Sequence, residues 1–589
     1  MEFEQKAEEK KMSMSKNIAR LAVTAGLTAA LSFGGVMAPV SMAFADGATA
    51  TANGSVKIEN VKGNHTEFYG YQIFNADVED GKVTNITWAN GEVETAVKGV
   101  IETVEPSYAG TTAQDAADWI TNQVKGTSDT FRVGPDSVAY KIAAAVDNLT
   151  DKTTTNNGVA SGLKHGYWLF VTKAETIGEG EAGTSPIFTV VGDTLVKVNE
   201  KTGIPTVEKK IVSDADAQEH DAADSQIGQD VTYNLYGTIA ENYDKYGEYF
   251  YEFSDQISKG LTLQSGAEVY LYDNMEDAKA DLAHKSGQKI TDKFEQSPEA
   301  TDNTTGAKTT KWTCKDLKKV DGVNSGSCIV VSYKAQINKW AVVAGTQGNE
   351  YKGNENTVTL HYSNDPMSNK PMPEGAGTSV SDTVKDYTYG LKINKVDLGT
   401  EKALPGATFT ITTVGDENRA EPNAKPKYVK DDGTLSTDRV ELSTDDNGVI
   451  KLTGLDAGVY TVEEVTPPSG YTKVNKFTFE IRPNMNGDDP NAGLTNLTHI
   501  LDPNNQEGKV IAGLTDKDAG DNKLTAKAKS EIDDEGYYNI TVGDAKRVGL
   551  PLTGLNGVTF TWIAGGAVLC IGVAHLIRSR KQAEESEQE

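Results

Sequence analysis

The sequence predicts a mainly β protein made of tandem immunoglobulin-like sandwiches that follow a first domain of α+β type. Short runs of alternating apolar and polar residues recur along the chain, separated by turns rich in glycine, asparagine and aspartate. The chain has 57 glycines, and few apolar residues recur at helical spacing over long segments. Apolar stretches stand near both termini, which predicts a processed segment at each end.

Residues 1–45 have the organisation of a cleaved signal peptide. Basic residues precede an uncharged stretch, 21–42, and the segment closes on small residues at positions 43 and 45. We therefore expect export and cleavage before Asp46. A membrane-spanning helix is the alternative, which Pro39 and several glycines disfavour.

The remaining chain is long enough for about three or four domains. We expect a first domain at 46–200, a β-sandwich at 201–366, a linker at 367–388 rich in proline, glycine, serine and asparagine, and a second β-sandwich at 389–546. The first domain should carry two short helices, 112–124 and 136–149. In the second of these, apolar residues recur at helical spacing.

The C-terminal segment 547–589 combines three elements in a fixed order. Residues 558–577 carry no formal charge and are long enough to cross a bilayer. A basic tail at 578–581 would hold that end in the cytoplasm and leave the preceding chain outside. Directly before the span stand Leu550, Pro551, Leu552, Thr553 and Gly554.

This order resembles the LPxTG cell-wall sorting signal of Gram-positive surface proteins. The resemblance implies that a sortase thiolate attacks the Thr553 carbonyl, releases the chain from Gly554 onward and passes the acyl group to an amine. The chain would then be a sortase substrate that is anchored in the membrane only until it is transferred to the cell wall.

Composition argues against several other functions. The formal net charge of −28 disfavours nucleic acid as a partner, because phosphates would be repelled. The seven histidines have no metal-ligand spacing, and the sequence has no nucleophile elbow or phosphate-binding loop. We therefore expect that the protein binds no metal and no cofactor. We also expect that it is not an enzyme, apart from forming its own internal bonds.

Two of the three cysteines lie outside the apolar C-terminal span. Cys314 and Cys328 flank a turn rich in glycine, asparagine and serine, 321–327. Outside the cell they would close a hairpin through a disulfide bond; two unpaired thiols are the alternative.

Three segments of the last domain carry a second resemblance: 391–397 (LKINKVD), 404–409 (LPGATF) and 460–471 (YTVEEVTPPSGY). Together they are similar to the Cna-B-type domain of Gram-positive adhesins and pilins. The resemblance implies a spontaneous amide between a first-strand lysine and a last-strand Asn or Asp, assisted by a glutamate. The matching positions here are Lys395 for the lysine and Glu464 for the assisting acid.

Strand phase supports this match, because alternate side chains share a face. Lys395 shares the face of Leu391 and Ile393, and Glu464 shares that of the apolar residues before it. Burial lowers the pKa of a lysine and raises that of a carboxyl group. A neutral amine beside a protonated acid is what amide formation needs.

The expected acceptor on the last strand is an aspartate, whereas asparagine is commoner at this position in the family that the domain resembles. Ile540 and Val542 point inward, and Asp544 shares their face, so we expect Asp544 to accept the amine with water as the leaving group. Asn539 is the alternative with suitable chemistry but the opposite phase. The alternative is that Lys395 and Glu464 form a buried ion pair and that no crosslink is made.

The first sandwich repeats the pattern. Lys209 shares a face with its apolar neighbours on the first strand, and Asn364 follows a strand with the same alternation. The segment 253–261 resembles the acid-bearing segment of a fimbrial isopeptide-forming domain, which implies Asp255 as the assisting acid. Alternatives are Lys210 for the amine and Asn356 for the acceptor.

The segment 196–201 (VKVNEK) resembles the VxVYPK-like motif of shaft pilins but lacks its Tyr-Pro pair. By that resemblance Lys201 would accept the Thr553 acyl group of another copy; Lys197 is the alternative. The chain would then be the shaft subunit of an adhesive pilus. The implied partners are a pilin-polymerising sortase, a housekeeping sortase, other copies of the chain, peptidoglycan, minor pilins and a host surface ligand. The rival reading is a monomeric wall-anchored adhesin whose first domain binds the ligand.

Overall fold

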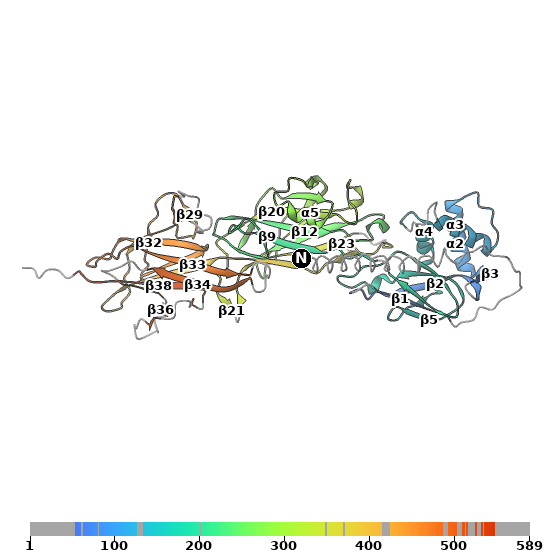
Figure 1. Ribbon diagram of the computed structural model, residues 1–589, viewed down its shortest axis with the longest axis horizontal. Coiled ribbons are helices and arrows are strands. Elements are labelled where there is room, and N and C mark those ends of the chain that lie inside the picture. Colours follow the sequence, from blue (N-terminus) through green and yellow to red (C-terminus); the bar gives the residue numbers. More distant parts are fainter. Residues whose placement is uncertain are drawn as a thin grey trace, which may run out of the picture. The chain divides into compact units, whose positions relative to one another are not determined.

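The computed structural model describes most of the chain between residues 54 and 547. The described ranges are 54–60, 63–79, 82–125, 134–200, 202–347, 350–368, 372–414, 425–486, 493–502, 509–512, 514–515, 525–526, 532–533 and 535–547. They divide into two compact units, one extending to Thr388 and including Pro483–Asn496, the other formed by Tyr389–Arg482 and the chain from Leu497 onward. Strands dominate both units (Figure 1), which confirms the predicted mainly β fold class.

The N-terminal part of the first unit contains two sheets. The order of the three-stranded sheet is β5 (Val159–Leu163), β1 (Gly54–Glu59) and β8 (Leu195–Asn199). The order of the second is β3 (Lys82–Trp88), β2 (Phe68–Glu79), β6 (Gly166–Thr172) and β7 (Ile187–Val191), with β4 (Thr153–Thr154) beside β2. Strand β6 is buried along its whole length, as expected for the centre of this fold.

Three α-helices accompany these sheets and gather beside β2 and β3 in Figure 1. They are α2 (Gly91–Val104), α3 (Ala113–Lys125) and α4 (Val138–Val146); a 3₁₀ helix, η1, spans Ala174–Thr176. Helices α3 and α4 agree with the two predicted segments. Helix α2 was missed, although the Asn90 side chain caps it by accepting a hydrogen bond from the backbone N–H of Val93.

A two-sheet sandwich follows. The first sheet has the order β10 (Glu219–His220), β9 (Val207–Val212), β12 (Asp230–Thr238), β20 (Cys328–Ile337), β15 (Glu268–Tyr272) and β16 (Gln288–Lys289), with β14 (Leu261–Leu263) beside β20. The second has the order β11 (Ala222–Asp224), β25 (Asp382–Tyr387), β23 (Asn354–Ser363), β13 (Tyr251–Ile257), β19 (Lys308–Cys314) and β17 (Glu295–Gln296), with β18 (Ala300–Thr301) beside β19 and β24 (Ala376–Thr378) beside β23.

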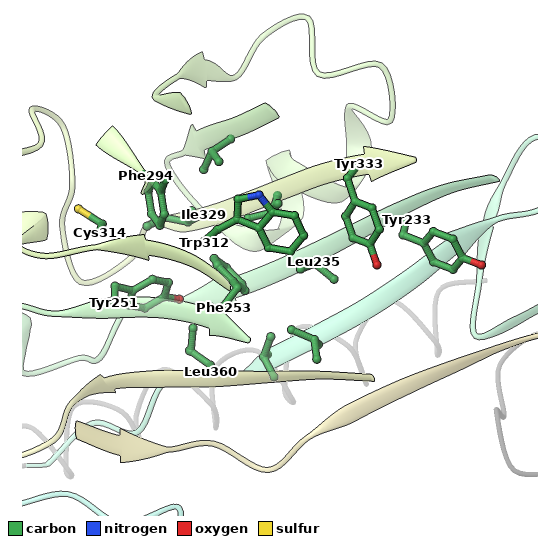
Figure 2. Packing of buried hydrophobic residues seen from close by; sticks show 14 of the residues in the cluster. Tyr233, Leu235, Tyr251, Phe253, Phe294, Trp312, Cys314, Ile329, Tyr333 and Leu360 are labelled. Carbon is green, nitrogen blue, oxygen red and sulfur yellow. The ribbon is translucent and has the colours of Figure 1, made fainter. Parts of the chain in front are cut away.

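Shorter elements decorate this sandwich. They are α5 (Met275–Ala280), the 3₁₀ helices η2 (Tyr243–Lys245), η3 (Thr291–Lys293) and η4 (Leu317–Lys319), and the pair β21 (Thr346–Gln347) and β22 (Glu350–Tyr351). One apolar cluster fills the space between the sheets (Figure 2), and aromatic side chains make up much of it. The alternating apolar residues of the strands therefore meet in a single core.

The predicted linker at 367–388 is wrong over its second half. Strand β25 pairs with β23 on one side and with β11 on the other. The carboxylate of Asp382 on β25 also accepts a hydrogen bond of 2.6 Å from the backbone N–H of Lys209 on β9. The prolines and glycines that suggested a linker all precede Thr378, whereas the following residues form a strand.

The predicted disulfide is also wrong. Cys314 and Cys328 are both free, buried thiols. They do not face each other across a hairpin, because β19 belongs to one sheet and β20 to the other. Cys314 lies in the central apolar cluster (Figure 2), whereas Cys328 packs in a separate cluster with Met275.

The second unit is again a two-sheet structure. One sheet has the order β31 (Val449–Leu455), β26 (Tyr389–Asp397), β38 (Tyr537–Asp544) and β35 (Lys509–Ala512). The other has the order β29 (Leu435–Ser436), β28 (Lys427–Val429), β27 (Thr408–Thr413), β32 (Gly458–Thr466), β33 (Phe477–Met485) and β34 (Leu494–Asp502), with β30 (Leu442–Ser443) beside β27; β36 (Leu514–Thr515) and β37 (Thr525–Ala526) form a separate pair.

The first and last strands of this unit are direct neighbours. Strands β26 and β38 run parallel, with Lys395 opposite Val542 and Asp397 opposite Asp544. Because side chains alternate, Asp544 lies on the same face as Lys395. It stands two residues beyond Val542, the residue opposite Lys395.

Several predicted segments lie outside the described residues. They are the signal peptide at 1–45, Lys201, the sorting motif at 550–554 and the apolar span at 558–577. Within the described ranges, no helix has the length and apolarity needed to cross a membrane.

Candidate functional site

The first candidate site surrounds a lysine on the opening strand of the first sandwich. Strand β9 alternates buried and partly buried residues, so Lys209 points inward together with Val207 and Ile211. Its side chain is 0% exposed. An ammonium group in such a place is costly unless each of its donors finds an acceptor.

All three donors of the Lys209 ammonium do find one. The amine nitrogen pairs with the Asp255 carboxylate, lies 2.5 Å from Oδ1 of Asn356 and lies 3.0 Å from the hydroxyl of Tyr333. Lys209 and Tyr333 come from β9 and β20 of one sheet, whereas Asp255 and Asn356 come from β13 and β23 of the other. We call these four residues the Lys209 cluster.

Asn356, the alternative acceptor, lies beside the Lys209 amine, whereas the predicted Asn364 does not. The Asn364 amide donates instead to the backbone carbonyl of Glu181, at 3.3 Å. Both asparagines share the inward phase of β23, but they stand eight residues apart, or about 26 Å along an extended strand. The register of β13 and β23 pairs Ile257 with Asn356, which brings that asparagine next to Asp255.

The alternative amine, Lys210, points to the other side of β9. Its nitrogen lies 2.5 Å from the carboxylate of Asp221. Strand alternation therefore separates the two adjacent lysines, and only Lys209 reaches the core.

Electrostatics at the first cluster favour a reactive amine. Burial lowers the pKa of Lys209 to about 8, against the opposing effect of the Asp255 carboxylate. A substantial fraction of the amine is then neutral near physiological pH, unlike that of a solvated lysine. A neutral amine is the form that attacks a carbonyl carbon.

The second candidate site lies in the C-terminal sandwich. The Lys395 amine pairs with the Asp544 carboxylate and lies 2.9 Å from Oε1 of Glu464. All three side chains are 0% exposed. Lys395 and Asp544 come from the paired strands β26 and β38, whereas Glu464 reaches across from β32 in the other sheet.

The acceptor position is held by a carboxyl group with an altered acidity. Burial raises the pKa of Asp544 to about 7, against the opposing effect of Lys395.

The alternative acceptor, Asn539, points to the other face of β38, where its amide donates to Asp533 at 3.1 Å. The backbone N–H of Val474 holds the other oxygen of Glu464 at 2.8 Å.

Both sites have the parts required for an amide bond between side chains. Each places a buried lysine amine against an Asn or Asp carbonyl group, with a second acid in contact. Bond formation would release ammonia at Asn356 and water at Asp544. Holding the reactants together in a dry core supplies much of the rate enhancement that an intramolecular reaction can have.

Sequence reasoning missed Tyr333 as a member of the first cluster. It stands in the run of alternating apolar residues that forms β20 and reads as ordinary core. Its hydroxyl position depends on how the two sheets face each other, and the sequence of one strand carries no signal for that.

Lys197, the alternative polymerisation lysine, is exposed on β8. The neighbouring Glu200 is buried and accepts a hydrogen bond of 2.7 Å from the Asn64 amide. The end of β8 is therefore held against the segment that follows β1.

Comparison with known proteins gives two sequence matches. Residues 390–496 match the SpaA prealbumin-like fold domain. The trypsin-resistant surface T6 protein of Streptococcus pyogenes serotype M6 is 31% identical over 162 residues, which make up 26% of this chain and 25% of that protein. The match therefore spans about a quarter of the relative's length.

Solved structures with similar folds include two pilins. The T6 backbone pilin of Streptococcus pyogenes serotype M6 is 15% identical with a TM-score of 0.47, covering 85% of this chain and 99% of that one. The full-length major pilin SpaD of Corynebacterium diphtheriae is 16% identical with a TM-score of 0.43, covering 84% and 98%.

The sequence matches confirm the predicted resemblance. Residues 390–496 are similar to the SpaA prealbumin-like fold domain, and part of the chain is similar to a streptococcal surface protein.

Proposed function

We propose that this protein is the structural subunit of a covalent surface pilus that serves in adhesion. A sortase would cleave after Thr553 and join its acyl group to a lysine of the next copy; Lys201 is our assignment for that lysine. A housekeeping sortase would finally transfer the polymer to peptidoglycan. The protein's own chemistry would be limited to forming its internal amide bonds.

The observation that carries this proposal is the pair of buried lysine clusters. The Lys209 cluster joins strands 147 residues apart in sequence, and the Lys395 cluster joins strands 149 residues apart. Closing a loop of that length by a covalent bond stabilises the folded state by about 5 kcal/mol in the chain-entropy model. Such a bond also carries tension without loading the hydrogen bonds of the sheets.

The two bonds would protect their domains to different extents. The Lys395–Asp544 bond would join the first and last strands of its sandwich, so tension would bypass that fold. The Lys209–Asn356 bond would leave β24 and β25 outside the closed loop, because both follow β23 in the chain. Subunits linked end to end in a fibre need this kind of protection, whereas a monomeric ligand-binding protein has less use for it.

The test is tandem mass spectrometry of protein released from the cell wall. A peptide joining Thr553 of one copy to Lys201 of another would support both the shaft role and the acceptor. A junction at Lys197 would keep the polymer but change the acceptor. Thr553 found only on cell-wall peptide would reject the polymer and favour a monomeric wall-anchored adhesin.

The same spectra test the internal bonds. The peptide containing Lys209 should be joined to that containing Asn356 with the loss of one ammonia. The peptide containing Lys395 should be joined to that containing Asp544 with the loss of one water. Unlinked peptides at both sites would reject self-crosslinking.

A further inference from the structure

The hydroxyl of Tyr333 touches every other member of the Lys209 cluster. It accepts a hydrogen bond of 2.7 Å from Nδ2 of Asn356 and one of 3.0 Å from the Lys209 amine. It donates a bond of 2.6 Å to Oδ2 of Asp255. The phenol oxygen therefore stands between the assisting acid and the nitrogen that would leave.

Packing fixes this hydroxyl in place. The Tyr333 ring stacks on Tyr233 with centroids 5.6 Å apart and on Trp312 with centroids 5.2 Å apart. Figure 2 shows the ring beside both aromatic groups, with its hydroxyl pointing away from its own strand. Burial, followed by the nearby Asp255 carboxylate, raises the pKa of Tyr333 well above its ordinary value. The phenol thus stays protonated and able to donate.

The reaction at Asn356 requires one proton to change place. The Lys209 nitrogen forms a bond to Cγ of Asn356, the bond from Cγ to Nδ2 breaks, and Nδ2 leaves as ammonia. The attacking nitrogen loses a proton in this process, and the leaving nitrogen gains one. Nδ2 acquires a free lone pair only when Cγ becomes tetrahedral, so its proton must be delivered at that stage.

We propose that Tyr333 is a catalytic residue of this reaction and relays a proton from Asp255 to Nδ2 of Asn356. Asp255 takes the proton from the Lys209 nitrogen on one carboxylate oxygen. Tyr333 gives its hydroxyl proton to the leaving nitrogen, and the Asp255 carboxyl group then turns and returns the proton that it holds to the phenol oxygen. No proton enters or leaves the cluster except with the ammonia. This inference rests on the proposed amide bond between Lys209 and Asn356.

The second cluster supports the assignment by contrast. In the part of the chain that the structure describes, the Lys395 amine makes polar contacts with two carboxyl groups and no hydroxyl. Its acceptor, Asp544, is itself an acid, so the oxygen that leaves can depart with a proton already bound or received from Glu464. An amide nitrogen has no such supply, which explains why a phenol is placed at Asn356 alone.

The test compares two tyrosine variants of the full chain. Tyr333→Phe removes the hydroxyl and keeps the stacked ring. Tyr251→Phe is the matched control, because Tyr251 lies in the same core and donates its hydroxyl to the backbone carbonyl of Thr238 at 2.8 Å, away from the cluster. The chains are made by cell-free synthesis, and the joined peptides of Lys209 and Asn356 are counted against time by mass spectrometry.

We expect Tyr333→Phe to form the bond at least about 100-fold more slowly, which is the usual effect of losing a general acid. Tyr251→Phe should form it at the rate of the unaltered chain. The bond between Lys395 and Asp544 in the same molecules reports that synthesis and processing are normal. Equal rates in Tyr333→Phe and the unaltered chain, or equal slowing in both variants, would overturn the relay.

Two further results keep the relay separate from folding and from the proposed function. If Tyr333→Phe fails to fold, difluorotyrosine at position 333 keeps the ring and the hydroxyl but changes its acidity; an unchanged rate then rejects the relay, and a changed rate supports it. If the unaltered chain never loses ammonia, the proposed bond itself fails. If it does so and Asp255→Ala does not, the bond stands whatever Tyr333 contributes.

Discussion

At the scale of single residues, the two lysine amines differ in the group that they face. Lys209 faces an amide at 2.5 Å, and Lys395 faces the carboxyl group of Asp544. In the proposed bonds this difference would set the leaving group and the role of the neighbouring acids. Each can be changed one side chain at a time.

We predict that Asp544→Asn forms the second bond more slowly than the unaltered chain and releases ammonia instead of water, because the described contacts of Lys395 include no hydroxyl to protonate the leaving nitrogen. The amide is nearly the same size as the carboxyl group, and Glu464 remains to assist at 2.9 Å from the amine. Asp544→Ala should leave Lys395 unjoined. Asn539→Ala is the control, because Asn539 lies on the other face of β38 and its loss should not affect the bond. Intact mass measurements distinguish the three variants.

We also predict that formation of the first bond depends on pH. The Lys209 reaction needs a neutral amine, so its rate should rise as pH increases through about 8. Freshly synthesised chain placed in buffers from about pH 6 to about pH 9 would show this trend. A rate that falls or stays level over this range would contradict the role assigned to the Lys209 amine.

At the scale of elements, the assignment of strands to sheets decides which side chains meet. Strands β19 and β20 are consecutive in the chain but belong to different sheets, which separates Cys314 from Cys328. The same arrangement brings Tyr333 on β20 across the core to Asp255 on β13. The assignment of β19 and β20 to different sheets thus separates the two cysteines and brings Tyr333 to Asp255.

We predict that both thiols are inert while the domain is folded. Burial raises the pKa of Cys328 to about 12 and raises that of Cys314 as well, so neither is appreciably ionised at neutral pH. Iodoacetamide should modify neither cysteine in the native chain and both after denaturation without a reducing agent. Modification only after reduction would reveal a disulfide and contradict the free thiols.

At the scale of the whole molecule, the proposed crosslinks would determine how far the chain can be stretched. A bond from Lys209 to Asn356 would enclose a loop of 147 residues, which could not extend while the bond held. A bond from Lys395 to Asp544 would enclose one of 149 residues. A protein under tension would therefore lengthen only through the segments outside these loops.

We predict that Lys209→Ala increases the fully stretched length by about 500 Å, at about 3.4 Å for each released residue. The first sandwich should also lose about 5 kcal/mol of stability, apart from the cost of leaving Asp255 unpaired. Force spectroscopy on single molecules measures the length, and Lys210→Ala provides the control. An equal length in Lys209→Ala and the unaltered chain would show that this loop is not closed.

The sequence alone was sufficient for the fold class and for the inward orientation of the reactive side chains. Strand alternation has a period of two, so the apolar neighbours of Lys209, Lys395 and Asp544 reveal the face on which each lies. Helix α4 was recognised because its apolar residues repeat at helical spacing. Helix α2 shows the same spacing at Val93, Val97 and Ile101 but was not recognised.

The tertiary structure decided which inward residues meet. Asn356 on β23 and Asn364, which directly follows that strand, have the same phase, and only the register of β13 against β23 selects Asn356. The distance between the two cysteines and the position of the Tyr333 hydroxyl depend on which sheet each strand joins and how the sheets face each other. Alternation is a local property of the chain and can be read along it, whereas register and sheet pairing arise from contacts between distant segments that no single strand encodes.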